Sequence, residues 1–132
     1  MTNQELIQKA ASVHNPVEIG NSSFGTVSCA LETIKGTLFT GVCIDTSSSM
    51  GFCAEHAAIG SMITSKEYKI HKIVAVKKDE QGNIFILSPC GRCREFMKQI
   101  NTENLDTQVI LNKNHSVRLE ELLPFHNSKE LV

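Results

Sequence analysis

Two short segments of the chain hold residue types that bind metal ions and move protons in enzymes. The first is Cys53-Ala54-Glu55, and the second is Pro89-Cys90-Gly91-Arg92-Cys93. Cys90 and Cys93 lie three residues apart at the start of an expected helix, so both sulfurs can face one point in space. Three thiolates suit Zn²⁺, which takes tetrahedral nitrogen and sulfur ligands. The spacing therefore predicts a zinc site formed by Cys53, Cys90 and Cys93.

Three protein ligands leave a fourth position open, which is typical of catalytic rather than structural zinc. Water in that position loses a proton more readily and becomes a nucleophile near neutral pH. Glu55 follows Cys53 by two residues, so its carboxylate is placed to act as base and proton carrier beside that water. The two segments therefore favour hydrolytic chemistry.

The charge of such a site needs compensation, because three thiolates outweigh one Zn²⁺ and make the bound water less acidic. Helix N-termini carry partial positive charge and lower thiol pKa values, and both segments open expected helices. Arg92 or Arg94 could also donate hydrogen bonds to the sulfurs, although either arginine is equally compatible with a solvated helix surface.

Strands alternate with helices along the chain, which predicts one α/β domain over residues 1–132 with helices on the sheet faces. Apolar spacing and capping signals predict the helices, and β-branched or alternating apolar runs predict the strands. The expected helices are 2–14, 53–64, 91–100 and a short one at 119–123, and the expected strands are 27–33, 37–45, 70–76, 84–87 and 108–111.

Composition narrows the class of protein further. The net charge is −1, which argues against a nucleic-acid-binding protein because a basic surface usually dominates that affinity. No apolar run approaches the roughly 20 residues that cross a bilayer, and the opening MTNQELIQKA lacks a signal-peptide pattern. With five cysteines, an odd number, we expect a cytoplasmic protein without a disulfide framework.

At the residues of the two segments the sequence resembles the cytidine deaminase family, and within it the small cytidine and blasticidin S deaminases. The resemblance covers roughly residues 24–125. It is strongest in Cys53-Ala54-Glu55 with the following Ala57-Ala58-Ile59, and in Ser88-Pro89-Cys90-Gly91-Arg92-Cys93-Arg94. Zinc nucleobase deaminases are typified by this arrangement, in which the glutamate is not a metal ligand.

The resemblance implies a three-layer α/β/α sandwich around a mixed five-stranded sheet, and a homotetramer that acts in pyrimidine salvage. It implies that a zinc-activated water attacks C4 of a free cytosine nucleoside and that ammonia leaves, with Glu55 moving the proton. Backbone N–H groups near Ala54 and Cys90 would hold the base. Arg94 is favoured as the arginine behind the sulfurs, and His56 occupies a position where the family often has arginine.

The expected sugar-binding stretch differs from that of cytidine deaminases. They carry an Asn-x-Glu pair for the ribose hydroxyls, where this chain has Cys43-Ile44-Asp45. Asp45 can still accept hydrogen bonds, whereas a cysteine replaces an amide poorly. Phe24 lies near the family's ring-packing phenylalanine, one residue out of register. We therefore expect Phe24, Cys43, Asp45 and Ala54 to contact the substrate, with blasticidin S or another modified cytosine nucleoside as the alternative.

Two alternative hypotheses for the function stay open. In the first, Cys43 supplies a fourth sulfur, the zinc site is closed and structural, and Glu55 is a surface charge. In the second, the enzyme acts on bases within RNA or DNA, which the lack of basic clusters disfavours.

Overall fold

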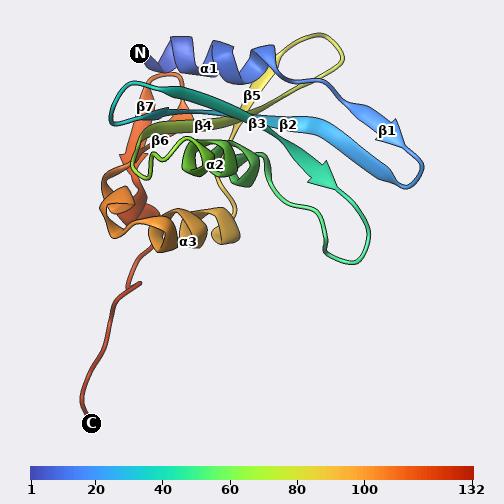
Figure 1. Ribbon diagram of the computed structural model, residues 1–132. Coiled ribbons are helices and arrows are strands. Elements are labelled where there is room, and N and C mark those ends of the chain that lie inside the picture. The colour runs from blue at the N-terminus through green and yellow to red at the C-terminus, as the bar shows by residue number, and fades with distance from the viewer.

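Seven strands form one mixed sheet, and three α-helices cover its two faces (Figure 1). The computed structural model describes residues 1–132. Its α-helices are α1 (Asn3–Ser12), α2 (Ala54–Thr64) and α3 (Gly91–Ile100), and its 3₁₀ helices are η1 (Thr102–Asp106) and η2 (Leu119–Leu122). Its strands are β1 (Val17–Ile19), β2 (Ser22–Thr33), β3 (Leu38–Asp45), β4 (Ile70–Lys78), β5 (Ile84–Leu87), β6 (Gln108–Asn112) and β7 (His115–Arg118).

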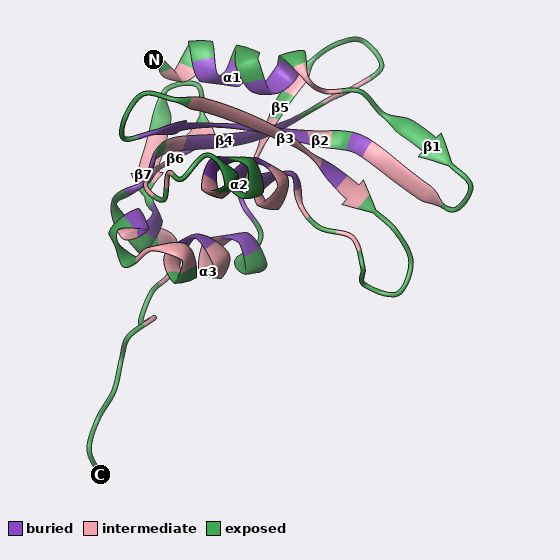
Figure 2. Cartoon of the chain, in the orientation of Figure 1, coloured by how far each residue is buried: buried purple, intermediate pink, exposed green.

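The predicted three-layer arrangement is confirmed. α1 lies on one face of the sheet, and α2 and α3 lie on the other (Figure 1). Each face has its own apolar cluster: α1 packs against residues of β2, β4 and β6, whereas α2 and α3 share the larger cluster with the opposite face. The buried residues of Figure 2 follow this division, being concentrated in the central strands and on the inward helix faces.

The sheet has seven strands, so the expectation of five was wrong in number. β2, β3, β4, β5 and β6 correspond to the five expected strands, and β1 and β7 are short additions at the ends. β1 (Val-Glu-Ile) has only three residues and is exposed, and β7 (His-Ser-Val-Arg) has four, so neither is long enough for the apolar alternation that reveals a strand in sequence. β4 is central: it pairs antiparallel with β2 and β5, and parallel with β6.

Local sequence explains where the site-bearing helix lies. α2 is rich in small residues and buries Ala54, Glu55, Ala58, Ile59 and Met62, so it can approach the sheet closely. At Gly41 of β3 the two elements are so close that an added Cβ would clash with the backbone nitrogen of Ala58. The missing side chain at Gly41 therefore sets the depth at which the N-terminus of α2 docks.

The chain ends in an extended segment after η2 that projects away from the sheet (Figure 1). Phe125 in this segment is 87% exposed. No helix of the protein combines the length and the apolar content needed to cross a membrane.

Replacing Gly41 with alanine tests the close packing of β3 against α2. The new methyl group meets backbone atoms of Ala58 and Ala54 that cannot rotate away, so Gly41→Ala is expected to lower the free energy of unfolding by about 1–3 kcal/mol. Gly60→Ala is the matched control on α2, because nothing lies within 4 Å of its added Cβ, and alanine should raise helix stability by up to about 1 kcal/mol. Urea denaturation measures both, and equal stabilities would contradict the packing argument.

Candidate active site

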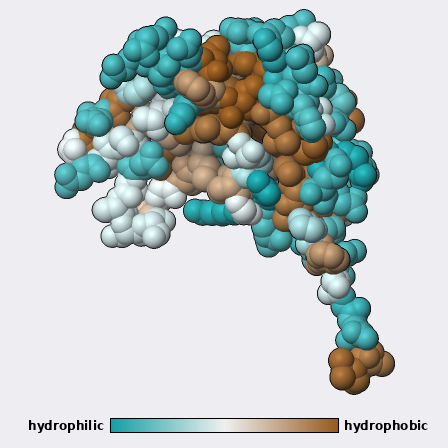
Figure 3. Space-filling model, turned by 180° about the vertical axis from the view of Figure 1, so that it is seen from behind, coloured by the Kyte–Doolittle hydropathy of each residue, from teal (hydrophilic) through white to brown (hydrophobic).

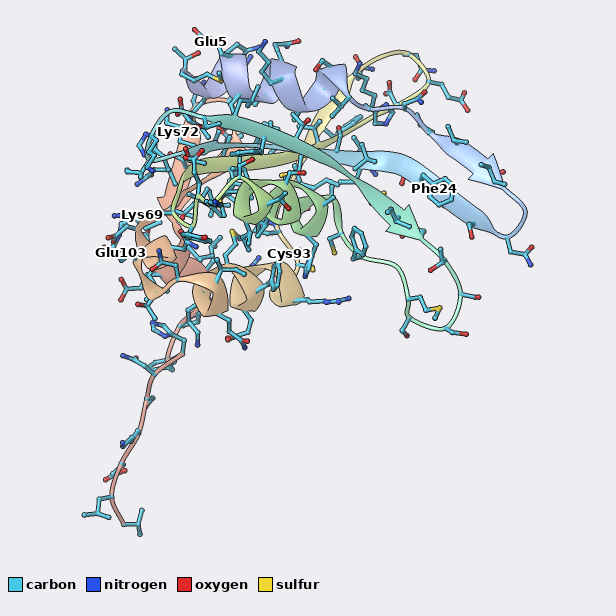
Figure 4. The ribbon with its side chains drawn as sticks, viewed as in Figure 1. Glu5, Phe24, Lys69, Lys72, Cys93 and Glu103 are labelled. Atoms are coloured by element: carbon cyan, nitrogen blue, oxygen red, sulfur yellow. The ribbon has the colours of Figure 1, made fainter.

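Two helix N-termini bring three cysteine sulfurs together. Cys53 is the N-cap residue of α2 and Cys90 is the N-cap residue of α3, and neither side chain caps its own helix. Cys93 lies in the first turn of α3 and is fully buried. The Cys53–Cys90 and Cys90–Cys93 sulfur pairs are each 3.6 Å apart, and all three sulfurs lie within 4.8 Å of one another. Figure 4 shows Cys93 where the start of α3 faces α2.

These distances suit a shared zinc ion. Sulfurs that each lie ~2.3 Å from a tetrahedral Zn²⁺ are about 3.8 Å apart, close to the two distances of 3.6 Å in this protein. Cys43 is not part of the group. Its sulfur lies 3.2 Å from Thr26 Oγ1 and accepts a hydrogen bond from the Val27 backbone N–H. The donor set is therefore three sulfurs with room for a fourth ligand that is not a cysteine.

The protonation of each thiol depends on its surroundings. Burial, followed by the nearby Glu55 charge, raises the pKa of Cys93 well above its usual range. Burial also raises the pKa of Cys53. Partial burial acts in the same direction on Cys90, but the nearby backbone N–H groups of Cys93 and Arg92 and the two neighbouring thiols outweigh it and lower the pKa of Cys90. A divalent ion that binds all three sulfurs therefore displaces the protons of Cys53 and Cys93.

Glu55 is a buried carboxyl group beside the sulfurs. It is the second residue of α2 and is only 6% exposed. Burial raises its pKa, although its own backbone N–H and the Cys93 thiol partly oppose the shift. A carboxyl group with a raised pKa is suited to both accepting and returning a proton.

Cys53, Cys90 and Glu55 line a cleft of about 230 Å³ that opens to solvent. Glu55 and the fully buried Ala54 form its deep part, whereas Asp45 is exposed at its edge.

Thr26, Val27 and Ser88 also line the cleft but were not predicted from the sequence. Ser88 could have been predicted, because it lies just before the Pro-Cys-x-x-Cys segment. Thr26 and Val27 lie where the register of β2 shifts between Phe24 and Ser28, so the sequence does not show which of their side chains faces the cleft. The lining residues are Thr26, Val27, Cys43, Asp45, Cys53, Ala54, Glu55, Ala75, Leu87, Ser88 and Cys90.

The expected substrate contacts divide into two groups. Cys43, Asp45 and Ala54 all line the cleft. Phe24 does not line it within this chain, because it lies on β2 opposite Ile44 and away from Cys93 (Figure 4).

His56 contacts one of the three sulfurs. Its Nδ1 is 3.4 Å from Cys93 Sγ, and its ring stacks on Phe96 with centroids 4.2 Å apart. Burial, followed by the Arg92 charge, lowers the pKa of His56, which favours a neutral ring whose Nδ1–H can donate to the sulfur. The neutral ring therefore contacts the sulfur without bringing the positive charge of an arginine.

Arg94 differs from the expectation. Its Nε donates to the Pro89 carbonyl at 2.9 Å and its Nη1 donates to the Leu122 carbonyl at 3.3 Å, and no hydrogen bond joins it to a sulfur. The reason is direction, since Arg94 follows Cys93 by one residue and so points to another side of α3. Arg94 therefore holds the loop before Cys90 and the end of η2.

Comparisons with known proteins agree with this geometry. Residues 1–108 match the family described as "Cytidine and deoxycytidylate deaminase zinc-binding region". A probable cytidine deaminase of Dictyostelium discoideum is 32% identical over 98 residues, which cover 71% of this chain and 65% of that protein. A blasticidin-S deaminase of Bacillus cereus is 31% identical over 103 residues, which cover 74% of each. The crystal structure of cytidine deaminase from Burkholderia pseudomallei has a TM-score of 0.73 at 24% identity, covering 94% of this chain and 98% of its own.

Zinc retention distinguishes the open site from a closed four-sulfur site. Cys90→Ser should lose zinc, because it removes one of three converging sulfurs, whereas Cys43→Ser should keep about one zinc per chain. Zinc is measured by atomic emission after dialysis against a mild chelator. Loss of zinc from both variants would mean that Cys43 is a fourth ligand and that the site is structural.

Proposed function

The chain belongs to the cytidine and deoxycytidylate deaminase family, and we propose that it removes the C4 amino group of a free cytosine nucleoside by hydrolysis. The fold, the deaminase family and the zinc-binding region predicted from sequence are confirmed by the matches. The observation that carries the proposal is the shared cleft, in which the buried carboxyl of Glu55 lies with Cys53 and Cys90. The products are the corresponding uracil nucleoside and ammonia, and residues 1–132 act as one catalytic domain.

Each part of the cleft has a role in this reaction. Cys53, Cys90 and Cys93 would hold a zinc ion, which would supply a nucleophile by lowering the pKa of water. Glu55 would carry one proton of that water to N3, where it stays in the uracil product, and would then carry the second proton, from the new C4 hydroxyl group, to the leaving amine. Backbone N–H groups at the starts of α2 and α3, near Ala54 and Cys90, orient the base, because the first N–H groups of a helix lack partners within the helix. Apolar Val27 and Leu87 exclude bulk water.

Blasticidin S is the second candidate substrate. The relative from Bacillus cereus, a blasticidin-S deaminase, covers more of its own length in the match than the Dictyostelium protein does. The Cys43-Ile44-Asp45 stretch supports a pocket that does not hold a ribose in the way an Asn-x-Glu pair does.

We also propose a cytoplasmic homotetramer with a role in pyrimidine salvage. Support for assembly comes from the surface, because large apolar side chains such as Phe85 and Phe125 are exposed at 48% and 87%. Figure 3 shows a broad hydrophobic area on the face opposite the view of Figure 1, and exposed apolar patches of this kind often mark protein–protein contacts. Phe24 and Phe125 are the residues of this chain that would approach a neighbouring subunit's cleft.

Glu55→Gln tests the proton carrier. The amide keeps the size of the side chain but cannot accept or return the proton, so kcat for cytidine deamination should fall by about 100-fold or more while zinc stays bound. Ammonia release and zinc content are measured together. Glu80→Gln, the same change at an exposed loop position, is the control and should leave both unchanged. Normal turnover by the Glu55 variant would contradict the mechanism.

A substrate panel tests the assigned substrate. Cytidine, deoxycytidine, blasticidin S, free cytosine and cytidine monophosphate are each followed by the loss of cytosine absorbance. Cytidine or deoxycytidine should be turned over with the highest kcat/KM. Turnover of blasticidin S alone would replace the first assignment with the second, and turnover of none would refute both.

A further inference from the structure

The cleft has an unusual charge balance for a site that binds a nucleoside. Asp45 and Glu55 are its ionisable oxygen groups, Cys43, Cys53 and Cys90 are its thiols, and it has no lysine, arginine or histidine in its lining. The zinc site does not correct this balance, because three thiolates outweigh the charge of Zn²⁺. A ligand in the cleft therefore meets a negative electrostatic potential.

Asp45 carries this charge at the mouth of the cleft. It is the last residue of β3 and is exposed, whereas Glu55 is buried at the deep end. Since the reacting ring must lie beside Glu55, the substituent on the ring nitrogen extends toward the mouth. Asp45 is thus the charged group that this substituent meets.

The carboxylate of Asp45 is free to bind a ligand. It takes part in no salt bridge. Its one hydrogen bond comes from the Cys43 thiol, which lies 3.6 Å from Oδ2, and a thiol is a weak donor. Cys43 itself is occupied, since its sulfur also contacts Thr26 Oγ1 and the Val27 N–H. The stretch that was expected to hold a sugar therefore offers one unpaired anion in place of an amide and a carboxylate.

We infer that Asp45 selects substrates by charge, so that cytosine nucleosides with a cationic group on the sugar are preferred, neutral ones are accepted and phosphorylated ones are rejected. This inference rests on the proposed function, because it assigns the substituent preference of the same cleft. An ammonium group near Asp45 gains a partly exposed ion pair. Such a pair raises the affinity by up to about fivefold. A phosphate group at the same place is repelled by Asp45 and meets no basic side chain in the lining.

The test compares three probes that differ mainly in charge: 5′-amino-5′-deoxycytidine, cytidine and cytidine 5′-monophosphate. At neutral pH and low salt, kcat/KM for the amino compound should exceed that for cytidine by about fivefold, and the monophosphate should be the poorest substrate. Asp45→Asn should bring the amino-to-cytidine ratio close to one, whereas Asp45→Glu and the exposed control Glu80→Gln should preserve it. Raising the salt concentration should reduce the ratio in the parent protein, because salt screens exposed charges.

A binding measurement separates this inference from the proposed reaction. In the Glu55→Gln background the probes should stay intact, and calorimetric titration gives their dissociation constants with and without Asp45→Asn. An equal dissociation constant for the amino compound and cytidine, or a preference that survives Asp45→Asn, would overturn the charge selection even if cytidine is deaminated. Absence of deamination with a preference for the amino compound that Asp45→Asn abolishes would refute the reaction and leave the charge selection standing.

Discussion

The convergence of three sulfurs at two helix N-termini is the constraint on which the site depends. Bringing Cys53, Cys90 and Cys93 within 4.8 Å of one another places like charges together in a partly buried position, which is unfavourable unless a cation is present. The first turns of α2 and α3 reduce the cost, because helix N-termini carry partial positive charge. His56 adds a hydrogen bond from behind at 3.4 Å. Metal binding and the docking of the two helices are therefore coupled.

The sheet supplies the rigidity that this coupling needs. α2 approaches β3 at Gly41 without a side chain between them, and it shares the larger apolar cluster with Met97 of α3. Arg94 fastens the loop before Cys90 to the end of η2 through two carbonyl groups. These contacts fix both N-cap cysteines relative to the same sheet, so the position of Glu55 follows from the helix that carries it.

Sequence reasoning succeeded where function depends on short local segments. The positions of Cys53, Cys90 and Cys93 followed from their spacing at helix starts. It failed where the outcome depends on distant geometry. The position of Phe24 depends on strand register near an irregularity in β2. One of the two carbonyl partners of Arg94, Leu122, lies far from it in the sequence. β1 and β7 have only three and four residues, which is too short to leave an apolar pattern.

Zinc K-edge X-ray absorption of the purified protein tests the central claim most directly, because it counts the atoms bound to the metal by element. The account predicts three sulfur neighbours at about 2.3 Å and one lighter nitrogen or oxygen neighbour at about 2.0 Å. A shell of four sulfurs, or of fewer than three, would contradict an open three-cysteine site and the hydrolytic chemistry built on it.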